Sequence, residues 1–123
     1  MPQMIIEYSD NIQQLDAQRL MLDLNHALFD TGLIGHPDEI KTRTRANANF
    51  LIGFGDTHQA YIHVCLAILT GRTAEQKSKM ADALISALQA FKAYDATGFN
   101  VQLCVELKEM PREDYRKVKF SPC

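Results

Sequence analysis

The sequence lacks the features that mark several common classes of protein. No apolar run approaches the roughly 18 residues that a membrane-spanning helix needs, so we expect no membrane partner. The N-terminus has no basic stretch followed by an apolar one, which predicts no secretory signal and a cytoplasmic location. The net charge is −2, whereas a nucleic-acid-binding domain is usually basic, so we expect no nucleic-acid partner.

Patterns typical of disulfide, metal and nucleotide sites are also missing. Cys65, Cys104 and Cys123 are odd in number and have no CxxC spacing, which argues against a disulfide framework and a zinc site. None of the four histidines belongs to an HxxxH or HExxH pair. The stretch GFGD at residues 53–56 is too short and too poorly placed to be a phosphate-binding loop. We therefore expect chemistry that needs no cofactor.

The residues that are present predict a single domain over residues 1–123. A chain of 123 residues with 46% hydrophobic residues has the size and composition of one globular unit. Alternating or β-rich stretches predict strands at residues 3–8, 40–46, 60–70 and 99–107. A further short strand is predicted at 50–52. The charged tail after Pro111 is expected to be either a short arm or an edge strand.

Two segments have the apolar spacing of helices. Residues 12–29 place apolar side chains on one helix face, with N-cap candidates at 9–11 and a stop at Gly32. The second helix is expected to begin after Thr73, because Thr73 and Gln76 have the spacing of a capping box. Its buried stripe is predicted to be Met80, Ala81, Leu84, Leu88 and Phe91.

The order strand, helix, strand occurs twice, which predicts an α+β fold. Two βαβ units with right-handed crossovers give a four-stranded mixed sheet with both helices on one face. The other face of the sheet is a mixture of polar, aromatic and cysteine side chains. It comprises Tyr61, His63, Cys65, Gln102, Cys104 and Glu106. Such a face is typical of a contact with another subunit or of an ordinary solvated sheet, and we favour the subunit contact.

A row of cations occupies the stretch KTRTR. Lys41, Arg43 and Arg45 alternate with threonines, so their side chains are expected to project from one face of a strand. Adjacent cations repel one another unless they meet anions, and arginine binds a carboxylate through two parallel hydrogen bonds. The row fits a substrate with more than one carboxylate. It also fits an edge strand protected from aggregation by charge, and the pattern alone slightly favours this alternative.

Two other positions are candidates for chemistry. Arg72 comes just before the second helix, where a helix N-terminus attracts anions, although a solvated arginine in a turn is the simpler interpretation. Pro2 becomes a free secondary amine if Met1 is removed. An ordinary α-amino group has a pKa of about 8, and nearby cations or a dry pocket lower it toward the range that suits a general base. The alternative is a proline that simply starts a strand.

Two further residues receive only structural expectations. Glu7 lies in the first predicted strand and is expected to be a surface or ion-paired carboxylate. His63 lies in the third and is expected to be a hydrogen-bonded core histidine.

Several of these stretches together resemble one family. MPQMIIEYSDNI, TGLIGHPDEIKTR, AYIHVCLAILTGRT and VQLCVELKEM are similar to segments of the 5-carboxymethyl-2-hydroxymuconate isomerases, members of the tautomerase superfamily. The resemblance covers nearly the whole chain. Its most specific parts are the N-terminal segment and the GR dipeptide before the second helix. The segment between Arg45 and Tyr61 and the C-terminal tail match loosely.

The resemblance implies a fold, an assembly and a reaction. It implies a tautomerase-like domain of two βαβ units that forms homotrimers, with active sites near subunit boundaries. After removal of Met1, Pro2 would shuttle a proton and convert a 2-hydroxymuconate-type dienol into its 2-oxo isomer, in bacterial breakdown of homoprotocatechuate. Arg72 would bind a carboxylate of this small anionic substrate and stabilise the dienolate. No cofactor is implied.

One position departs from the family pattern. The second substrate-binding arginine of the family aligns with Lys41, which keeps the charge but loses the bidentate fork. Arg43 is expected to share that face and to compensate. The departure, together with the amide that Pro2 keeps while Met1 is present, leaves an alternative open. The chain would then be a non-catalytic module that binds small carboxylates or serves in an assembly.

Overall fold

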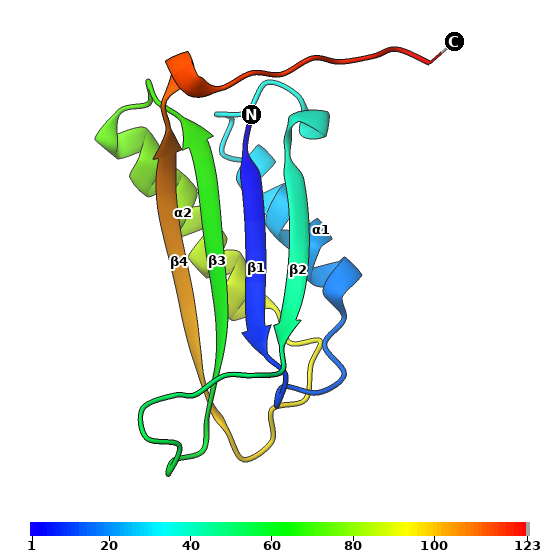
Figure 1. The fold of residues 1–123 in the computed structure, drawn as a ribbon, viewed down its shortest axis with the longest axis vertical. Helices are drawn as coiled ribbons and strands as arrows, with labels where there is room; N and C mark the ends of the chain where they lie inside the picture. The colour runs from blue at the N-terminus through cyan, green and yellow to red at the C-terminus, as the bar shows by residue number, and fades with distance from the viewer. Residues whose placement is uncertain (123) are drawn as a thin grey trace.

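The computed structural model describes residues 1–122 as one four-stranded sheet with two helices packed behind it (Figure 1). The strand order is β2-β1-β3-β4, and the β1–β2 and β3–β4 pairs are parallel while β1 and β3 are antiparallel. The strands are β1 (Gln3–Ser9), β2 (Lys41–Asn47), β3 (Gln59–Leu69) and β4 (Asn100–Met110). The helices are α1 (Ala17–Phe29), α2 (Ala74–Ala90) and the short 3₁₀ turns η1 (Pro37–Glu39) and η2 (Arg112–Asp114). The predicted mixed sheet with both helices on one face is confirmed.

The core lies between the sheet and the two helices. Along β3, residues alternate between fully buried and half-buried, because side chains of a strand point to opposite faces in turn. Ile62, Val64 and Leu66 face the helices and are 0% exposed. They pack in one apolar cluster with the stripe of α2, which includes the predicted Met80 and Leu84.

The start of α2 was correctly predicted and that of α1 was not. The Thr73 hydroxyl accepts from the Gln76 amide at 3.1 Å and the Gln76 side chain accepts from the Thr73 amide at 2.9 Å, which completes the capping box. By contrast, α1 begins only at Ala17, after an N-cap at Asp16, so the cap candidates at 9–11 were wrong. The predicted first turn is instead a bend, because Gln14 has a φ of 55° there.

The bend before α1 still buries Ile12, the apolar residue that was predicted to begin the helix. Gln13 forms an isolated antiparallel bridge with Asp95, through backbone hydrogen bonds of 2.8 and 2.7 Å. Ile12 is buried by this route with 3% exposure, without belonging to a helix. Apolar spacing alone therefore extended the predicted helix by five residues beyond the real one.

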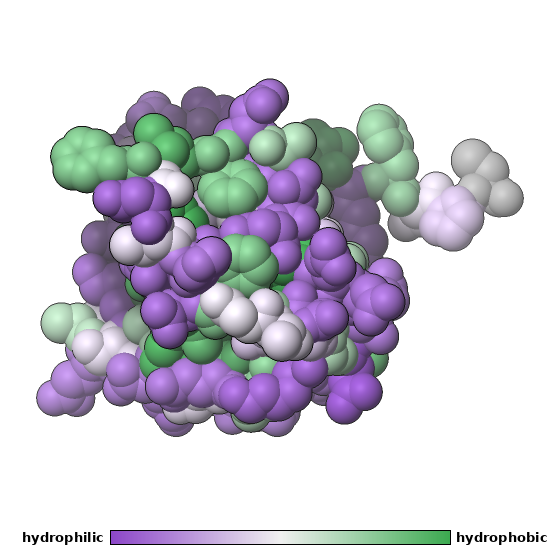
Figure 2. Space-filling view, turned by 90° about the horizontal axis from the view of Figure 1, so that it is seen from below, coloured by the Kyte–Doolittle hydropathy of each residue, from purple (hydrophilic) through white to green (hydrophobic). Residues whose placement is uncertain are grey.

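Residues 48–58 form a loop at the lower end of the sheet, not the short strand predicted at 50–52 (Figure 1). Nothing in the described part of the chain pairs with this stretch, so its apolar residues have no ladder to join. Leu51 and Phe54 are 74% and 95% exposed. Figure 2 shows this end from below as mostly hydrophilic, with a group of apolar side chains on one side.

The tail after Pro111 is an arm and not an edge strand. It makes the single turn η2 and then runs across the upper end of the sheet (Figure 1). Among residues 1–122 no helix is both long and apolar enough to cross a membrane.

Candidate active site

The topology gathers four parts of the chain at the upper end of the sheet. Parallel pairing with β1 places the start of β2 beside the start of β1. Antiparallel pairing of β1 and β3 brings the end of β3 to the same place, and β4, parallel to β3, ends there as well. Figure 1 shows the N-terminus, η1 and the C-terminal arm at this end. Residues that are up to 116 positions apart in sequence therefore meet.

Pro2 is buried at the start of β1. Its carbonyl oxygen accepts a hydrogen bond of 3.1 Å from the backbone amide of Lys41, which fixes the beginning of β1 against the beginning of β2. Met1 precedes it and is half-buried. The candidate base and the first residue of the cationic strand are thus adjacent.

The charges around the N-terminus are mostly positive. Burial is the main reason that the pKa of the Met1 amino group is lowered from its ordinary value, and the Glu39 carboxylate acts in the opposite direction. The positive charges of Arg72, Lys41 and Lys117 lower this pKa further. The group at the N-terminus therefore lies in a partly dry environment that disfavours an ammonium ion.

Arg72 reaches the site from the turn between β3 and α2. Its guanidinium donates to the carbonyl oxygen of Leu33, at 3.1 Å, and its side chain is half-buried. Gly71 has a φ of +126°, a conformation that is strained for any other residue. The backbone conformation is therefore the reason that glycine suits this turn, because a Cβ at Gly71 would make only ordinary contact with the Arg112 guanidinium, at 3.4 Å.

The predicted alternation of the cationic strand is confirmed. Thr42 bonds to Asn25 of α1 and so faces the helices, whereas Lys41, Arg43 and Arg45 lie on the open face. Only Lys41 lies at the upper end, where its ammonium donates to the Glu39 carbonyl oxygen at 3.1 Å.

The other two cations of β2 lie progressively farther from the N-terminus. Arg43 and Arg45 are roughly 7 and 13 Å farther along the strand than Lys41, since each residue advances the chain by about 3.3 Å. The Arg43 guanidinium donates to Gln3 Oε1 at 2.7 Å. The structure therefore brings Pro2, Lys41 and Arg72 together, keeps Arg43 next to them and leaves Arg45 apart.

Glu7 and His63 belong to the open face of the sheet and not to the upper end. Glu7 is half-buried, and its Oε1 accepts a hydrogen bond of 3.3 Å from Asn47 Nδ2. His63 Nε2 lies 3.1 Å from Glu106 Oε1, and its side chain is 35% exposed. The expectation of a core histidine was wrong, because odd-numbered residues of β3 point away from the helices.

A hollow of about 450 Å³ opens beside the N-terminus, between η1 and the C-terminal arm. It is lined by His36, Asp38, Glu39, Lys41, Lys117, Val118 and Lys119. Neither Glu39 nor Lys117 was predicted from the sequence as a site residue. Glu39 could have been predicted, because it comes two residues before Lys41 and parallel pairing of β1 and β2 places the start of β2 beside the N-terminus. The charged arm has no periodicity that would have placed Lys117.

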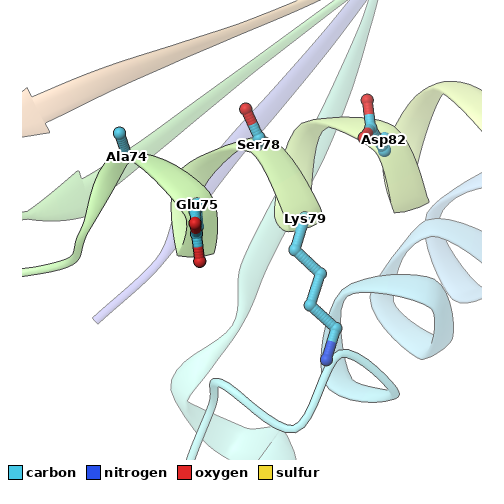
Figure 3. A pocket seen from close by; sticks show the side chains of 5 residues that line it. All are labelled: Ala74, Glu75, Ser78, Lys79 and Asp82. Atoms are coloured by element: carbon cyan, nitrogen blue, oxygen red, sulfur yellow. The ribbon is translucent and has the colours of Figure 1, made fainter.

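A second hollow, of about 460 Å³, lies on the outer side of α2 and has no such gathering of elements. Figure 3 shows its lining side chains, all from one helix: Ala74, Glu75, Ser78, Lys79 and Asp82. These side chains spread apart instead of converging, and no residue of another element joins them. Within residues 1–122, no group of three or more His, Cys, Asp or Glu side chains is arranged to hold a metal ion.

Comparison with solved structures gives the fold a family context. A 5-carboxymethyl-2-hydroxymuconate isomerase from Deinococcus radiodurans R1 superposes with a TM-score of 0.84, at 22% identity over 97% of this chain and 90% of that one. A 5-carboxymethyl-2-hydroxymuconate delta-isomerase superposes with a TM-score of 0.74, at 18% identity over 98% of this chain and 89% of that one. A fused 4-OT, described as a symmetric trimer, superposes with a TM-score of 0.67, at 20% identity over 92% of this chain and 89% of that one. These similarities show the tautomerase fold.

Sequence comparison is more specific. No curated protein sequence matches the chain. The family model for 5-carboxymethyl-2-hydroxymuconate isomerase matches residues 2–120, which is nearly the whole chain and includes Pro2, Lys41, Arg72 and most of the C-terminal arm. The chain therefore belongs to the 5-carboxymethyl-2-hydroxymuconate isomerase family, and this membership supports an isomerase of the tautomerase type.

Proposed function

We propose that the protein is an enol–keto isomerase that acts on a 2-hydroxymuconate-type di- or tricarboxylate, with 5-carboxymethyl-2-hydroxymuconate as the first candidate. The observation that carries this proposal is the position of Pro2, buried at the start of β1 beside the cations Lys41 and Arg72. A potential base and two carboxylate partners thus converge at one end of the sheet. Family membership supports the same reaction class.

The reaction begins once Met1 has been removed and the Pro2 nitrogen is a free amine. The amine takes the proton of the 2-hydroxyl group, and the electrons of that O–H bond form the C2 carbonyl. The C2–C3 double bond then moves to C3–C4, and the electrons of the C4–C5 double bond take the proton back from Pro2 at C5. Atoms and electrons balance without a cofactor.

The cations have separate tasks in this mechanism. Arg72 would bind a carboxylate and stabilise the negative oxygen of the dienolate. Lys41 would hold another carboxylate, as a point charge without the planar fork of arginine. Arg43, whose guanidinium lies on the neighbouring part of the open face, would assist Lys41. The same cations disfavour the protonated amine and so favour a base at neutral pH.

The open face of the sheet supports a homotrimer, as described for the fused 4-OT. In the isolated chain, Cys104 of β4 is exposed and Ile5 of β1 is only half-buried, both on this face. Burying the face against two further copies would place the upper end of each sheet near a subunit boundary. A small anionic substrate and a cytoplasmic location complete the proposal.

The experiment separates processed from unprocessed protein. Intact mass identifies the chain without Met1, and the ultraviolet band of 5-carboxymethyl-2-hydroxymuconate or 2-hydroxymuconate reports turnover. We expect the processed protein to be active and the Met1-retaining protein, its matched control, to be inactive. Pro2→Ala should lower kcat by about 10²- to 10⁴-fold while the trimer remains intact by light scattering. A processed protein that leaves both bands unchanged contradicts the proposal.

A second candidate function is a non-catalytic module that binds small carboxylates or takes part in an assembly. It is favoured by Lys41, which stands where the family pattern has an arginine and lacks the planar fork that binds a carboxylate in two places. The intact mass of protein from its native cell distinguishes the two functions. A homogeneous chain that keeps Met1 supports the module, and a homogeneous free proline supports the isomerase.

A further inference from the structure

The C-terminal arm is fastened to the upper end of the sheet where it leaves β4. The Thr70 amide donates to the Met110 carbonyl oxygen at 3.1 Å, which extends the pairing of β3 and β4 to their ends. The Arg112 Nε then donates to the Thr70 carbonyl oxygen at 2.7 Å. These bonds hold the start of the arm beside the turn that carries Arg72.

Beyond this anchor the arm crosses the N-terminus (Figure 1). The Lys117 ammonium lies 3.5 Å from the Met1 sulfur, and Lys117 and Lys119 line the hollow together with Lys41. A thioether is only a weak acceptor, so the ammonium has no strong partner in this contact. Met1 thus occupies space that faces both the start of β1 and a lysine of the arm.

We propose that Lys117 is a substrate-binding residue that selects tricarboxylates over dicarboxylates. This inference rests on the proposed function and adds a third cation to Lys41 and Arg72. 5-Carboxymethyl-2-hydroxymuconate has three carboxylates, and Lys117 would bind the one that Lys41 and Arg72 do not hold. When Met1 is removed, the ammonium of Lys117 loses its thioether neighbour and faces the vacated space beside Pro2.

The charge balance of the hollow fits an anionic ligand. Asp38 and Glu39 contribute two negative charges. Lys41, Lys117 and Lys119 contribute three positive charges to the same hollow. Arg72 adds a fourth at the N-terminus. The arm therefore changes a nearly neutral hollow into a positive one.

The test uses the processed full-length protein and a matched pair of ligands without the 2-hydroxyl group. 3-Carboxymuconate has three carboxylates and muconate has two, and neither can undergo the reaction. We expect Lys117→Gln to weaken calorimetric binding of 3-carboxymuconate roughly tenfold, as for loss of a hydrogen bond to a charged group, and to change muconate binding little. Lys117→Arg should retain most of the affinity.

Arg116→Gln is the control, because Arg116 lies in the same arm and, among residues 1–122, its side chain bonds to the backbone of Glu113 and Tyr115. Equal losses in both variants, equal losses for both ligands, or no binding of 3-carboxymuconate to the wild type would each overturn the role of Lys117. In kinetics, the expected effect of Lys117→Gln is a higher KM for 5-carboxymethyl-2-hydroxymuconate, with kcat unchanged. Selective binding by a protein that does not isomerise the substrate refutes the proposed function and leaves the role of Lys117 standing.

Discussion

The two faces of the sheet differ although they belong to the same strands. On β3, the residues that face the helices are fully buried within a single chain, whereas Tyr61, His63 and Cys65 on the open face remain half-exposed. The covered face is almost purely apolar. The open face mixes cysteines, aromatic rings and charges. The difference teaches that one face is completed by the chain's own helices, and that the other is compatible with completion by further copies.

Several polar groups of the open face are paired with one another. Asn47 Nδ2 donates to the Tyr61 hydroxyl at 2.6 Å as well as to Glu7, and His63 contacts Glu106. A polar group costs free energy when it is buried without a partner. Pairing within one subunit lowers this cost, so the face can be buried in an interface without becoming apolar.

The largest expected effect tests the covered face with neighbouring residues of β3. Leu66→Ala removes a fully buried side chain and should lower the free energy of unfolding by about 2–5 kcal/mol. Cys65→Ala, its matched control on the open face, should cost less than about 1.5 kcal/mol, because the side chain is small and half-exposed. Urea unfolding measures both. Equal costs would contradict the division of the sheet into two kinds of face.

The next prediction concerns a charge that is introduced on the open face and leaves the core unchanged. Cys104→Asp puts a carboxylate on each copy at the proposed interface, where an unpaired charge is costly to bury. We expect light scattering to show a shift from trimer to monomer, with little change in far-ultraviolet circular dichroism. Ser86→Asp, on the exposed side of α2, is the control and should leave the mass unchanged. A Cys104→Asp protein that stays trimeric would place the interface elsewhere.

Thiol reactivity sharpens the comparison. Burial raises the pKa of the Cys65 thiol, so less reactive thiolate is present at neutral pH than for a free cysteine. Alkylation of Cys65 should therefore be slow and should accelerate as the pH rises. Cys104 is exposed in the single chain, and slow labelling of it in the native protein would show that the open face is covered. Cys123, which lies outside the described residues, is replaced by serine in this experiment.

The smallest expected effect concerns the upper end, where the two faces meet. The Pro2 amine, the proposed base, would act when deprotonated, so kcat/KM should rise with pH through the pKa of this amine. Lys41→Gln removes a cation that disfavours the ammonium, so this pKa should increase and the rising limb should move to higher pH. Glu39 favours the ammonium form of the Met1 amino group. We expect the same effect on the Pro2 amine after processing, so Glu39→Gln should move the limb to lower pH. Shifts in the same direction would contradict this account of the charges.

Much of the fold could be predicted because local patterns agreed with the tertiary structure. The capping box at Thr73 and the alternation of Lys41, Arg43 and Arg45 depend on neighbouring residues only, and both are confirmed. The site was predicted in part, since the structure brings Pro2, Lys41 and Arg72 together. Their chemical roles remain predictions.

The errors arose where distant parts of the chain decide the conformation. The start of α1 depends on a bridge between Gln13 and Asp95, which apolar spacing cannot reveal. The stretch at 50–52 is apolar but has no strand to pair with. Lys117 reaches Met1 only because Arg112 fastens the arm to the end of β3, and no local pattern encodes that contact.

The burial of Pro2 has a consequence for timing. An aminopeptidase must draw the Met1–Pro2 bond into its own active site, but in the folded chain Pro2 is covered and its carbonyl oxygen is bonded to Lys41. If Met1 is removed as proposed, cleavage would compete with folding and would be fastest on the nascent chain, before β1 joins the sheet. Chains that fold first would then keep Met1 and lack a free amine. The active fraction would then be set by the relative rates of cleavage and folding during synthesis.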